Sequence, residues 1–431
     1  MLIPSCSKPP VTSDSRVAQQ ERNNLHLISA ETALASLDAF LGVPQDAQTK
    51  ASVQEKDISV IRLTDIPSSN RSFLGSIDCD ELVYLVNFSG EEGYAILAAD
   101  DRIGDDVIAV VDKGSITAEE MLNCYSAYYS DDDSVTEEDH LGAMLYKMCL
   151  DYATKQVTRV DSTDVGNDII ERFEVNFQTV IVDSVSPMLT AEVSWNQGEP
   201  FNWFCPVLGN GNRAYTGCVP LAVSKIFAYF EYPAYISYNN VTVDWTALKS
   251  NFWSTTGSQS AAALLRFIGV GCNSMYFSEG TFTLPGSARG FMEDCFYSNV
   301  ILDDYSTSSV VSMLEDDCPL FICSLPHDGF FNYDFANSHA WNIDGYKTTQ
   351  TITTYYVFVN GIYDHTEIIY SPQSTKVHCD FGWGGYHNGY YASGIFQLNA
   401  YGIEYDNPTL PHTETTNYNY YLKIITYDNP L

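Results

Sequence analysis

A glycine turn that leads directly into a helical pattern is the feature that most constrains what this chain can fold into. It covers residues 216–222, Thr-Gly-Cys-Val-Pro-Leu-Ala, and puts Cys218 where the helix begins. Pro220 fits the first turn, where its missing N–H costs nothing, and apolar residues follow at the spacing of one buried helix face: Ala222, Ile226, Tyr229 and Phe230. The helix dipole lowers the pKa of a thiol at this end and favours the thiolate. The pattern therefore fits a nucleophile, and it also fits a small buried cysteine that packs a helix start.

Length and charge limit the class of protein. At 431 residues the chain is long enough for two domains or three, and a hydrophobic content of 45% supplies real cores. The 30 Tyr and 27 Gly favour a loop-rich fold that contains β-structure. The 55 acidic and 21 basic residues give a formal net charge of −34, which excludes nucleic-acid binding and disfavours anionic membranes.

The N-terminus suggests export, and the cysteines suggest no common metal or disulfide framework. The 11 cysteines are scattered without CxxC pairs, so neither a zinc ribbon nor a dense disulfide scaffold is expected. No stretch of about 18 apolar residues is present, so we expect no transmembrane segment. Residues 1–6 resemble the end of a bacterial lipoprotein signal with Cys6 as a possible lipid anchor, although the charged and hydrophobic parts of a leader are missing. Residues 1–25 are expected to form a flexible tail.

The N-terminal half predicts a small α+β unit. A helix is expected over 29–41, capped by Ser29 and with Ala33, Leu37, Phe40 and Leu41 on its buried stripe. Residues 81–88 and 93–99 predict a hairpin, 105–111 a third strand and 141–157 a second helix. The polar stretch 158–168 indicates the start of a linker, and the composition places a domain boundary between about 165 and 188.

Three further segments carry groups that a thiol nucleophile needs. His339 begins an alternating pattern that predicts a short strand ending at a glycine turn, where the imidazole serves either as a base or as a structural residue. Residues 377–391 predict an aromatic-rich hairpin with Asp380 and Trp383 at its turn, which is also plausible as plain structure. Gln197, about twenty residues before Cys218, is a candidate oxyanion donor, although such a residue is usually surface.

Taken together these segments resemble the streptopain-type cysteine peptidases. The motifs are Trp-Asn-Gln with Pro-Phe-Asn in 195–202, Thr-Gly-Cys-Val in 216–219, His-Ala-Trp to Ile-Asp-Gly in 339–345, and Phe-Gly-Trp-Gly-Gly to Gly-Tyr-Tyr in 381–391. Their order, Gln, Cys, His and Asn or Asp, is that of papain-like enzymes. Residues 84–102 also resemble the inhibitory pro-domain of the same family. The resemblance covers roughly residues 28–425.

The resemblance implies an α+β fold, with a papain-like two-lobe peptidase domain over 181–431. Before it would stand an α+β pro-domain with a small antiparallel sheet over 26–180, removed by cleavage between about 165 and 188. Cys218 would be the nucleophile and His339 the acid and base. Gln197 and the Cys218 N–H would form the oxyanion hole, Asp380 would orient the imidazole and Trp383 would flank it.

The implied protein is a secreted or surface-anchored bacterial endopeptidase made as a zymogen. Its partners would be protein or peptide substrates and its own pro-domain as inhibitor. It needs no cofactor or metal, since His378, Cys379 and Asp380 are adjacent on a strand and alternate between its faces. The expected location is extracellular or on the cell surface, including an outer-membrane lipoprotein.

Three departures from the family pattern keep other functions open. The family has Asn-Trp where this chain has Asp380-Phe381, Gly where it has Ser338, and more often an apolar residue at Asn342. A negative charge at 380 would shift the pKa of His339. One alternative is a catalytically silent member that binds a protein partner through the same cleft. Another is a thiol–imidazole hydrolase that acts on cell-wall peptides.

Overall fold

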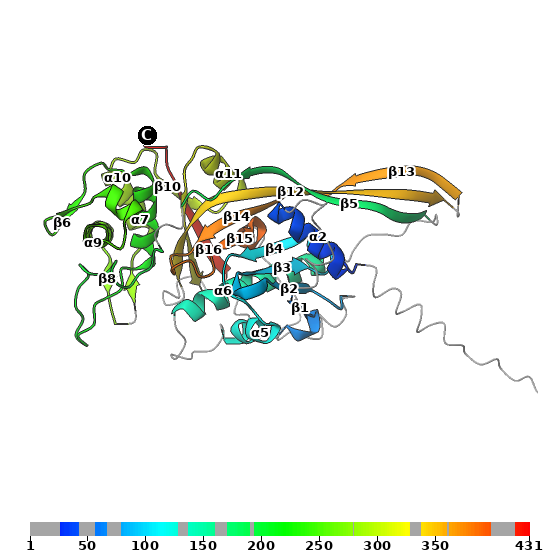
Figure 1. Cartoon of the computed structure of the whole chain (residues 1–431), viewed down its shortest axis with the longest axis horizontal. Coiled ribbons are helices and arrows are strands. Elements are labelled where there is room, and N and C mark those ends of the chain that lie inside the picture. Colours follow the sequence, from blue (N-terminus) through cyan, green and yellow to red (C-terminus); the bar gives the residue numbers. More distant parts are fainter. Residues whose placement is uncertain are drawn as a thin grey trace, which may run out of the picture.

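Strands from both halves of the chain join in one antiparallel sheet (Figure 1). This computed structural model describes residues 26–42, 57–66, 79–127, 137–159, 170–189, 194–278, 280–327, 338–359, 362–397 and 419–431. The expected tail and Cys6 lie outside these residues. The main path of the sheet runs β1-β2-β3-β4-β15-β14-β12-β11-β16-β10, and both β5 and β13 also pair with β12.

The N-terminal part of the sheet lies between helices. Its strands are β1 (Asp57–Ile61), β2 (Val83–Asn87), β3 (Tyr94–Ala98) and β4 (Val107–Val111). Helix α2 (Ala30–Leu41) packs on one face, while α5 (Ala118–Ala127) and α6 (Glu137–Arg159) belong to the core on the other. Every residue of β3 and β4 is buried because both faces are covered, which explains their unbroken apolar sequence.

Most of the expected N-terminal elements form. The Ser29 side chain accepts a hydrogen bond from the N–H of Thr32 and caps α2. Leu37 and Phe40 are buried as expected, but Leu41 is 42% exposed, since the helix ends there and Gly42 turns the chain away.

The expectation of a small separate sheet is wrong. Strand β4 pairs with β15 (Gly389–Ala392), so the four N-terminal strands form one end of a 12-stranded sheet. Unpaired strand edges readily accept a further strand, and a sequence pattern does not say which edge will do so. Two regions far apart in the sequence are therefore joined through backbone hydrogen bonds.

The C-terminal half places α7 (Cys218–Phe230), α9 (Thr255–Gly271) and α10 (Pro285–Asp294) at one end of the molecule, while its longest strands extend toward the other end (Figure 1). Its other helices are α8 (Trp245–Ser250) and α11 (Thr307–Glu315). The strands of the large sheet are β10 (Ile301–Asp304), β11 (Leu320–His327), β12 (His339–Val359), β13 (Ile362–Tyr370), β14 (Ser374–Asp380) and β16 (Asn419–Thr426). Two short hairpins pair β6 (Ser237–Tyr238) with β7 (Val241–Thr242) and β8 (Met275–Tyr276) with β9 (Thr281–Phe282).

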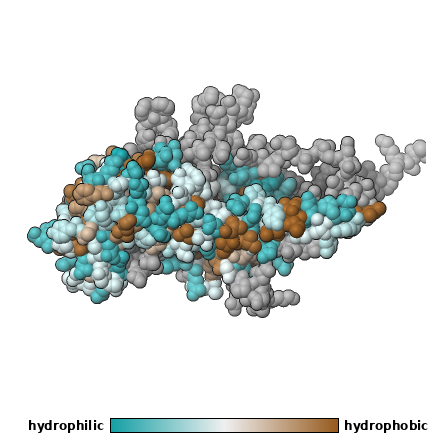
Figure 2. Space-filling view, turned by 90° about the horizontal axis from the view of Figure 1, so that it is seen from above, coloured by the Kyte–Doolittle hydropathy of each residue, from teal (hydrophilic) through white to brown (hydrophobic). Residues whose placement is uncertain are grey.

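The expected linker region is mostly strand. Residues Ile170–Val185 form β5, which pairs antiparallel with β12 over its whole length. With β13 these strands form an extended arm, and Figure 2 shows hydrophobic side chains gathered along it. The alternation of Phe173, Val175 and Phe177 with polar residues is a strand signal that the change in composition concealed.

Candidate active site

Cys218 is the first residue of α7. Gly217 before it has a φ of 92°, and a Cβ there would lie 2.9 Å from Thr281 Cγ2, so only glycine fits this turn. The Cys218 side chain is half-buried. The expected apolar face is confirmed at Ala222, Ile226 and Phe230, but the other sides of α7 are buried as well.

The environment of Cys218 differs from that of most other cysteines. No disulfide links the cysteines within the described ranges. Burial raises the pKa of Cys205 to about 11 and the pKa of both Cys272 and Cys323 to about 12, so these thiols stay protonated at neutral pH. Cys218 instead combines partial exposure with a helix N-terminus, which is the environment of a reactive thiol.

His339 begins β12, but this strand is not short. It continues through Gly345 to Val359, and the register shifts at Gly345 where a turn was expected. A Cβ on Gly345 would lie 2.9 Å from the carbonyl oxygen of Val185 at the end of β5. The glycine therefore serves a close backbone approach and not a chain reversal.

The imidazole of His339 is held by a backbone carbonyl and by aromatic rings. Its Nε2 lies 3.1 Å from the Phe381 carbonyl oxygen, and its ring stacks with Trp341 and Trp383 at centroid distances of 6.1 and 5.9 Å. A carbonyl only accepts hydrogen bonds, so Nε2 carries the proton and Nδ1 is left as an acceptor. Trp383 thus lies beside the imidazole of His339.

Burial lowers the pKa of His339 to about 4. The Phe381 carbonyl opposes this shift, and the positive charge of Lys225 adds to it. At neutral pH the imidazole is consequently neutral in this form of the chain and able to accept a proton at Nδ1.

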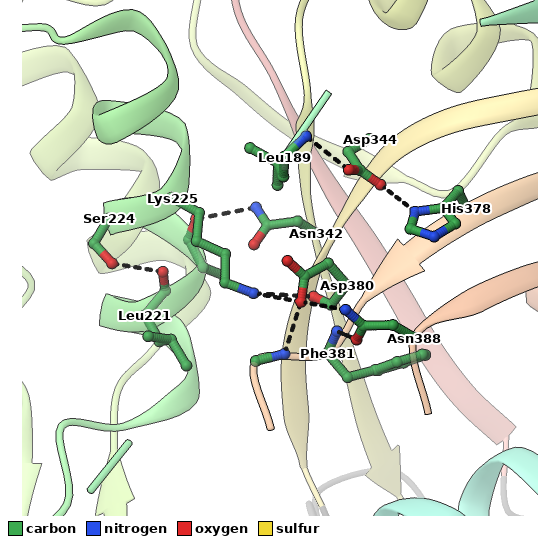
Figure 3. Close-up of polar contacts among 12 residues, drawn as sticks. Leu189, Leu221, Ser224, Lys225, Asn342, Asp344, His378, Asp380, Phe381 and Asn388 are labelled. Atoms are coloured by element: carbon green, nitrogen blue, oxygen red, sulfur yellow. Dashed lines mark hydrogen bonds and ion pairs between the residues drawn. The ribbon is translucent and has the colours of Figure 1, made fainter. Parts of the chain in front are cut away.

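Asp380 directly precedes Phe381, whose carbonyl contacts His339. The Asp380 carboxylate interacts with Lys225, Asn388 and the Gly382 N–H (Figure 3). Its Oδ1 lies 2.7 Å from Lys225 Nζ and accepts hydrogen bonds from Asn388 Nδ2 at 3.0 Å and from the Gly382 N–H at 3.2 Å. Burial alone would raise the pKa of Asp380, but Lys225 and these donors lower it, so the carboxylate is charged.

Sequence reasoning missed two groups at this site, Lys225 and the Phe381 carbonyl. A backbone carbonyl leaves no trace in the sequence. The one available signal was a lysine within the mostly apolar pattern of α7.

Gln197 and its neighbours connect the cysteine and histidine segments. The Gln197 carbonyl accepts the N–H of Thr216 at 3.1 Å, two residues before Cys218. The carbonyl of Trp195 accepts the N–H of Gly384 at 2.8 Å, next to Trp383. The buried Gln197 therefore lies in the segment that bridges the start of α7 and the 381–388 loop.

The start of α7 packs directly against β12 and this loop. Asn342 Nδ2 donates to the Ala222 carbonyl at 3.0 Å and to the Leu320 carbonyl at 3.2 Å, which gives the unexpected polar residue a structural role (Figure 3). The Cys218 side chain is close enough to Cys323 to contribute, after burial, to its raised pKa. Cys323 pairs with Ala340, the neighbour of His339. These contacts bring the cysteine and histidine segments to one place.

The N-terminal part contacts the same loop from the other side. The Asp112 N–H donates to the Asn388 carbonyl at 2.8 Å, and the His387 ring lies 6.2 Å from the Tyr146 ring on α6. Asp112 Oδ2 also lies 3.3 Å from Nε2 of His378, whose Nδ1 lies 2.6 Å from Asp344 Oδ1. Burial alone would lower the pKa of His378, but the two carboxylates raise it to about 10.

No cluster of three or more His, Cys, Asp or Glu side chains suited to a metal ion occurs among the described residues. Within the same ranges, no helix is both long enough and apolar enough to cross a membrane.

Comparison with protein families finds a family model that matches a little under half of the chain. The family is Peptidase C10, whose model matches residues 195–391. This segment contains every side chain that the sequence proposed for the site, from Gln197 to Trp383.

The relatives extend the similarity beyond that segment. The chain is 24% identical over 328 residues to the thiol protease/hemagglutinin PrtT of Porphyromonas gingivalis, an alignment that covers 72% of this chain and 33% of the relative. The chain thus spans about a third of the length of this curated protein.

Among solved structures, a prointerpain A fragment of Prevotella intermedia has a TM-score of 0.50 at 15% identity and covers 87% of this chain and 100% of its own. Active interpain A from the same organism has a TM-score of 0.38 at 20% identity and covers 57% and 95%. The likeness to the prointerpain fragment shows a shared mixed α/β fold that includes the N-terminal region.

Proposed function

We propose that this chain is a bacterial cysteine endopeptidase made as a zymogen, with Cys218 as nucleophile and His339 as acid and base. The observation that carries the proposal is the meeting of the start of α7 with the His339 strand and the 381–388 loop, inside the segment that matches the family. Gln197 and the Cys218 N–H would stabilise the oxyanion, and Trp383 would shield the imidazole. The reaction needs no metal or cofactor.

The hydrogen bond of His339 suggests the route of the proton. Because Nε2–H donates to the Phe381 carbonyl, Nδ1 would take the proton of the Cys218 thiol. The thiolate would attack the carbonyl carbon of the scissile peptide bond, and its oxygen would become the oxyanion. Nδ1–H would then protonate the departing amine. A water molecule, deprotonated by the same nitrogen, would hydrolyse the thioester and restore the thiol.

The N-terminal region would act as the inhibitory pro-domain, residues 26–180, and the peptidase domain would follow over 181–431. Contacts with the 381–388 loop, which carries Phe381 and Trp383, support this role. Cleavage is expected between about 165 and 188. Within that window β5 is paired along β12, so a cut there requires β5 to leave β12. The acidic surface and the sequence before Cys6 favour a secreted or surface-anchored enzyme.

The test compares the wild-type chain with Cys218→Ala and His339→Ala. We expect wild type to cleave itself in the 165–188 window, read by mass spectrometry of the new N-terminus, and then to hydrolyse unfolded casein. Both variants should do neither, and a thiol-reactive epoxide should label the processed wild type at Cys218. Full self-processing by Cys218→Ala would refute the assignment.

Two other results point to the alternative functions. A processed wild type that is inert toward casein but binds a protein through the site would be a silent family member. Hydrolysis of muropeptides without casein cleavage would identify a cell-wall hydrolase.

A further inference from the structure

A buried lysine joins the helix of Cys218 to the loop that holds His339. Lys225 lies in α7 and its side chain is 1% exposed. Burying an ammonium group is costly unless it is paired and hydrogen-bonded. Its partners are the carboxylate of Asp380 at 2.7 Å and the backbone carbonyl of the same residue at 3.5 Å (Figure 3). A residue that only filled space here would be apolar, as most residues of α7 are.

The position of Lys225 on α7 relates it to Cys218. The two residues are seven apart, two helical turns, and so lie close to one stripe of the helix. Leu221 lies between them on that side, since a Cβ on Gly382 would be 2.6 Å from Leu221 Cδ2 and 3.6 Å from Lys225 Nζ. The stripe that starts at Cys218 therefore faces the 381–388 loop.

Asp380 links Lys225 to the backbone segment whose carbonyl contacts the imidazole. Its Oδ1 accepts the Gly382 N–H and Asn388 Nδ2, and Asn388 Oδ1 in turn accepts the Phe381 N–H at 2.9 Å. The N–H of Gly382, which shares a peptide group with the Phe381 carbonyl, and the N–H of Phe381 in the preceding peptide group are thus both hydrogen-bonded. That carbonyl accepts Nε2–H of His339.

We propose that Lys225 is a positioning residue, which through Asp380 and Asn388 fixes the Phe381 carbonyl and hence the imidazole of His339 relative to Cys218. This proposal rests on the proposed function for the reaction whose rate is measured, which is peptide hydrolysis. The contacts that position the imidazole do not depend on it. The proposal also explains an aspartate at 380: the carboxylate faces a cation on the nucleophile helix, and a backbone carbonyl holds the histidine. Two variants test the chain of contacts at different points.

The first variant, Lys225→Met, removes the cation, and the second, Asn388→Ala, breaks the link to Phe381 without changing a charge. In the processed enzyme we expect each to lower kcat/KM by about 10²-fold, mostly through kcat, because a displacement of about 1 Å at the imidazole costs that much. Lys225→Gln combined with Asp380→Asn keeps a neutral hydrogen-bonded pair and should recover at least tenfold over Lys225→Met. The control is Lys249→Met, which removes a cation that pairs with Glu231 at the far end of α7 and is 41% exposed. It should leave kcat/KM within twofold.

A second readout does not need activity. In the uncleaved chain, kept intact by Cys218→Ala and carrying ¹³C-labelled histidine, the His339 signal, assigned by its loss in His339→Ala, reports the pKa of the ring. The charged or titratable groups around it are Lys225 on α7 and Asp380 and His387 on the 380–388 segment. We expect Lys225→Met to raise the His339 pKa and the double variant to return it toward that of wild type. If Lys225→Met only loosened the packing around the ring, the double variant would not restore the pKa.

Three outcomes would overturn the proposal. The first is that Lys225→Met and Asn388→Ala both leave kcat/KM within twofold and the titration unchanged. The second is a Lys225→Gln/Asp380→Asn double variant that recovers less than tenfold in kcat/KM over Lys225→Met. The third applies if Lys225→Met does not fold: then unchanged titration and rate in Asn388→Ala alone refute it. If wild type hydrolyses no peptide, the proposed function fails, and the titration still decides whether Lys225 and Asn388 position the ring.

Discussion

Replacing Gly382 tests whether α7, the helix that begins at Cys218, packs on the 381–388 loop, whose Phe381 carbonyl contacts His339. Gly382 has a φ of +78°, and a Cβ there would lie 2.6 Å from Leu221 Cδ2 in the first turn of α7. Gly384, two residues on, has a φ of +67° and would place a Cβ with nothing within 4 Å. Alanine at either position suffers the same backbone strain, but only at 382 does it collide with α7. The two variants therefore form a matched pair.

The difference between them has a definite size. A left-handed alanine costs roughly 1–2 kcal/mol, and overpacking a core contact adds about 1–3 kcal/mol. A change of 1 kcal/mol shifts Tm by about 2–4 °C in a domain of roughly 150–250 residues, about the size of the proposed peptidase domain over 181–431. Gly384→Ala should therefore lower the Tm of this domain by about 2–8 °C. Gly382→Ala should lower it further, by about 2–12 °C beyond Gly384→Ala.

The assay is thermal unfolding of the uncleaved chain in a Cys218→Ala background, which prevents self-processing. In a further Leu221→Ala background the collision partner is gone, so Gly382→Ala should then cost no more than Gly384→Ala. Equal Tm shifts for the two glycine variants with Leu221 present would refute the packing of α7 on the loop.

Three further predictions concern titration and the N-terminal region. Because the folded pKa of His339 is about 4, against 6.5 for the free group, the unfolded chain binds a proton that the folded chain does not. Acidification from pH 7 to 4 should therefore remove about 3 kcal/mol of stability, fully lost below pH 4, and His339→Gln should flatten this part of the pH–stability curve. His378 has the opposite sign: its pKa of about 10 gives stability that is complete below pH 6.5 and lost as pH rises toward 10. Asp112→Asn should move that alkaline loss to lower pH, with an effect near 0.2–1 kcal/mol because Asp112 is 47% exposed; an unchanged alkaline limb would show that the pair does not form. Finally, in an inactive Cys218→Ala chain cut in the linker by an added protease, the N-terminal fragment should co-elute with the peptidase in gel filtration. Gly389→Ala, whose Cβ would lie 2.1 Å from the Val110 carbonyl oxygen between β4 and β15, should release it; co-elution of that variant would contradict the pairing.

Local patterns predicted the elements that depend on local chemistry. The Ser29 cap, the hairpin of β2 and β3, and the helix that begins at Cys218 all follow from spacing and capping within a few residues. The convergence of the Cys218 and His339 segments followed from the family resemblance and not from any local signal.

Features that depend on distant partners were not accessible. The pairing of β4 with β15 joins residues almost three hundred positions apart, and nothing in either strand names the other. Gly345 was expected to end a strand because glycine usually marks a turn, whereas it admits β5 against β12. Asp380 was assigned to the imidazole because aspartate is a common orienter, but the sequence alone does not show that Lys225 is within its reach.

Both halves of the chain contact the 381–388 loop. From one side Lys225 and Asp380 fix the peptide groups around Phe381. From the other, Asp112 hydrogen-bonds the backbone of Asn388, whose side chain belongs to the same network. In the proposed zymogen, a displacement of the N-terminal strands would therefore reach the carbonyl that holds His339 through Asn388. The proposed inhibitory domain would then not need to reach Cys218, because it would act on the segment that holds the imidazole.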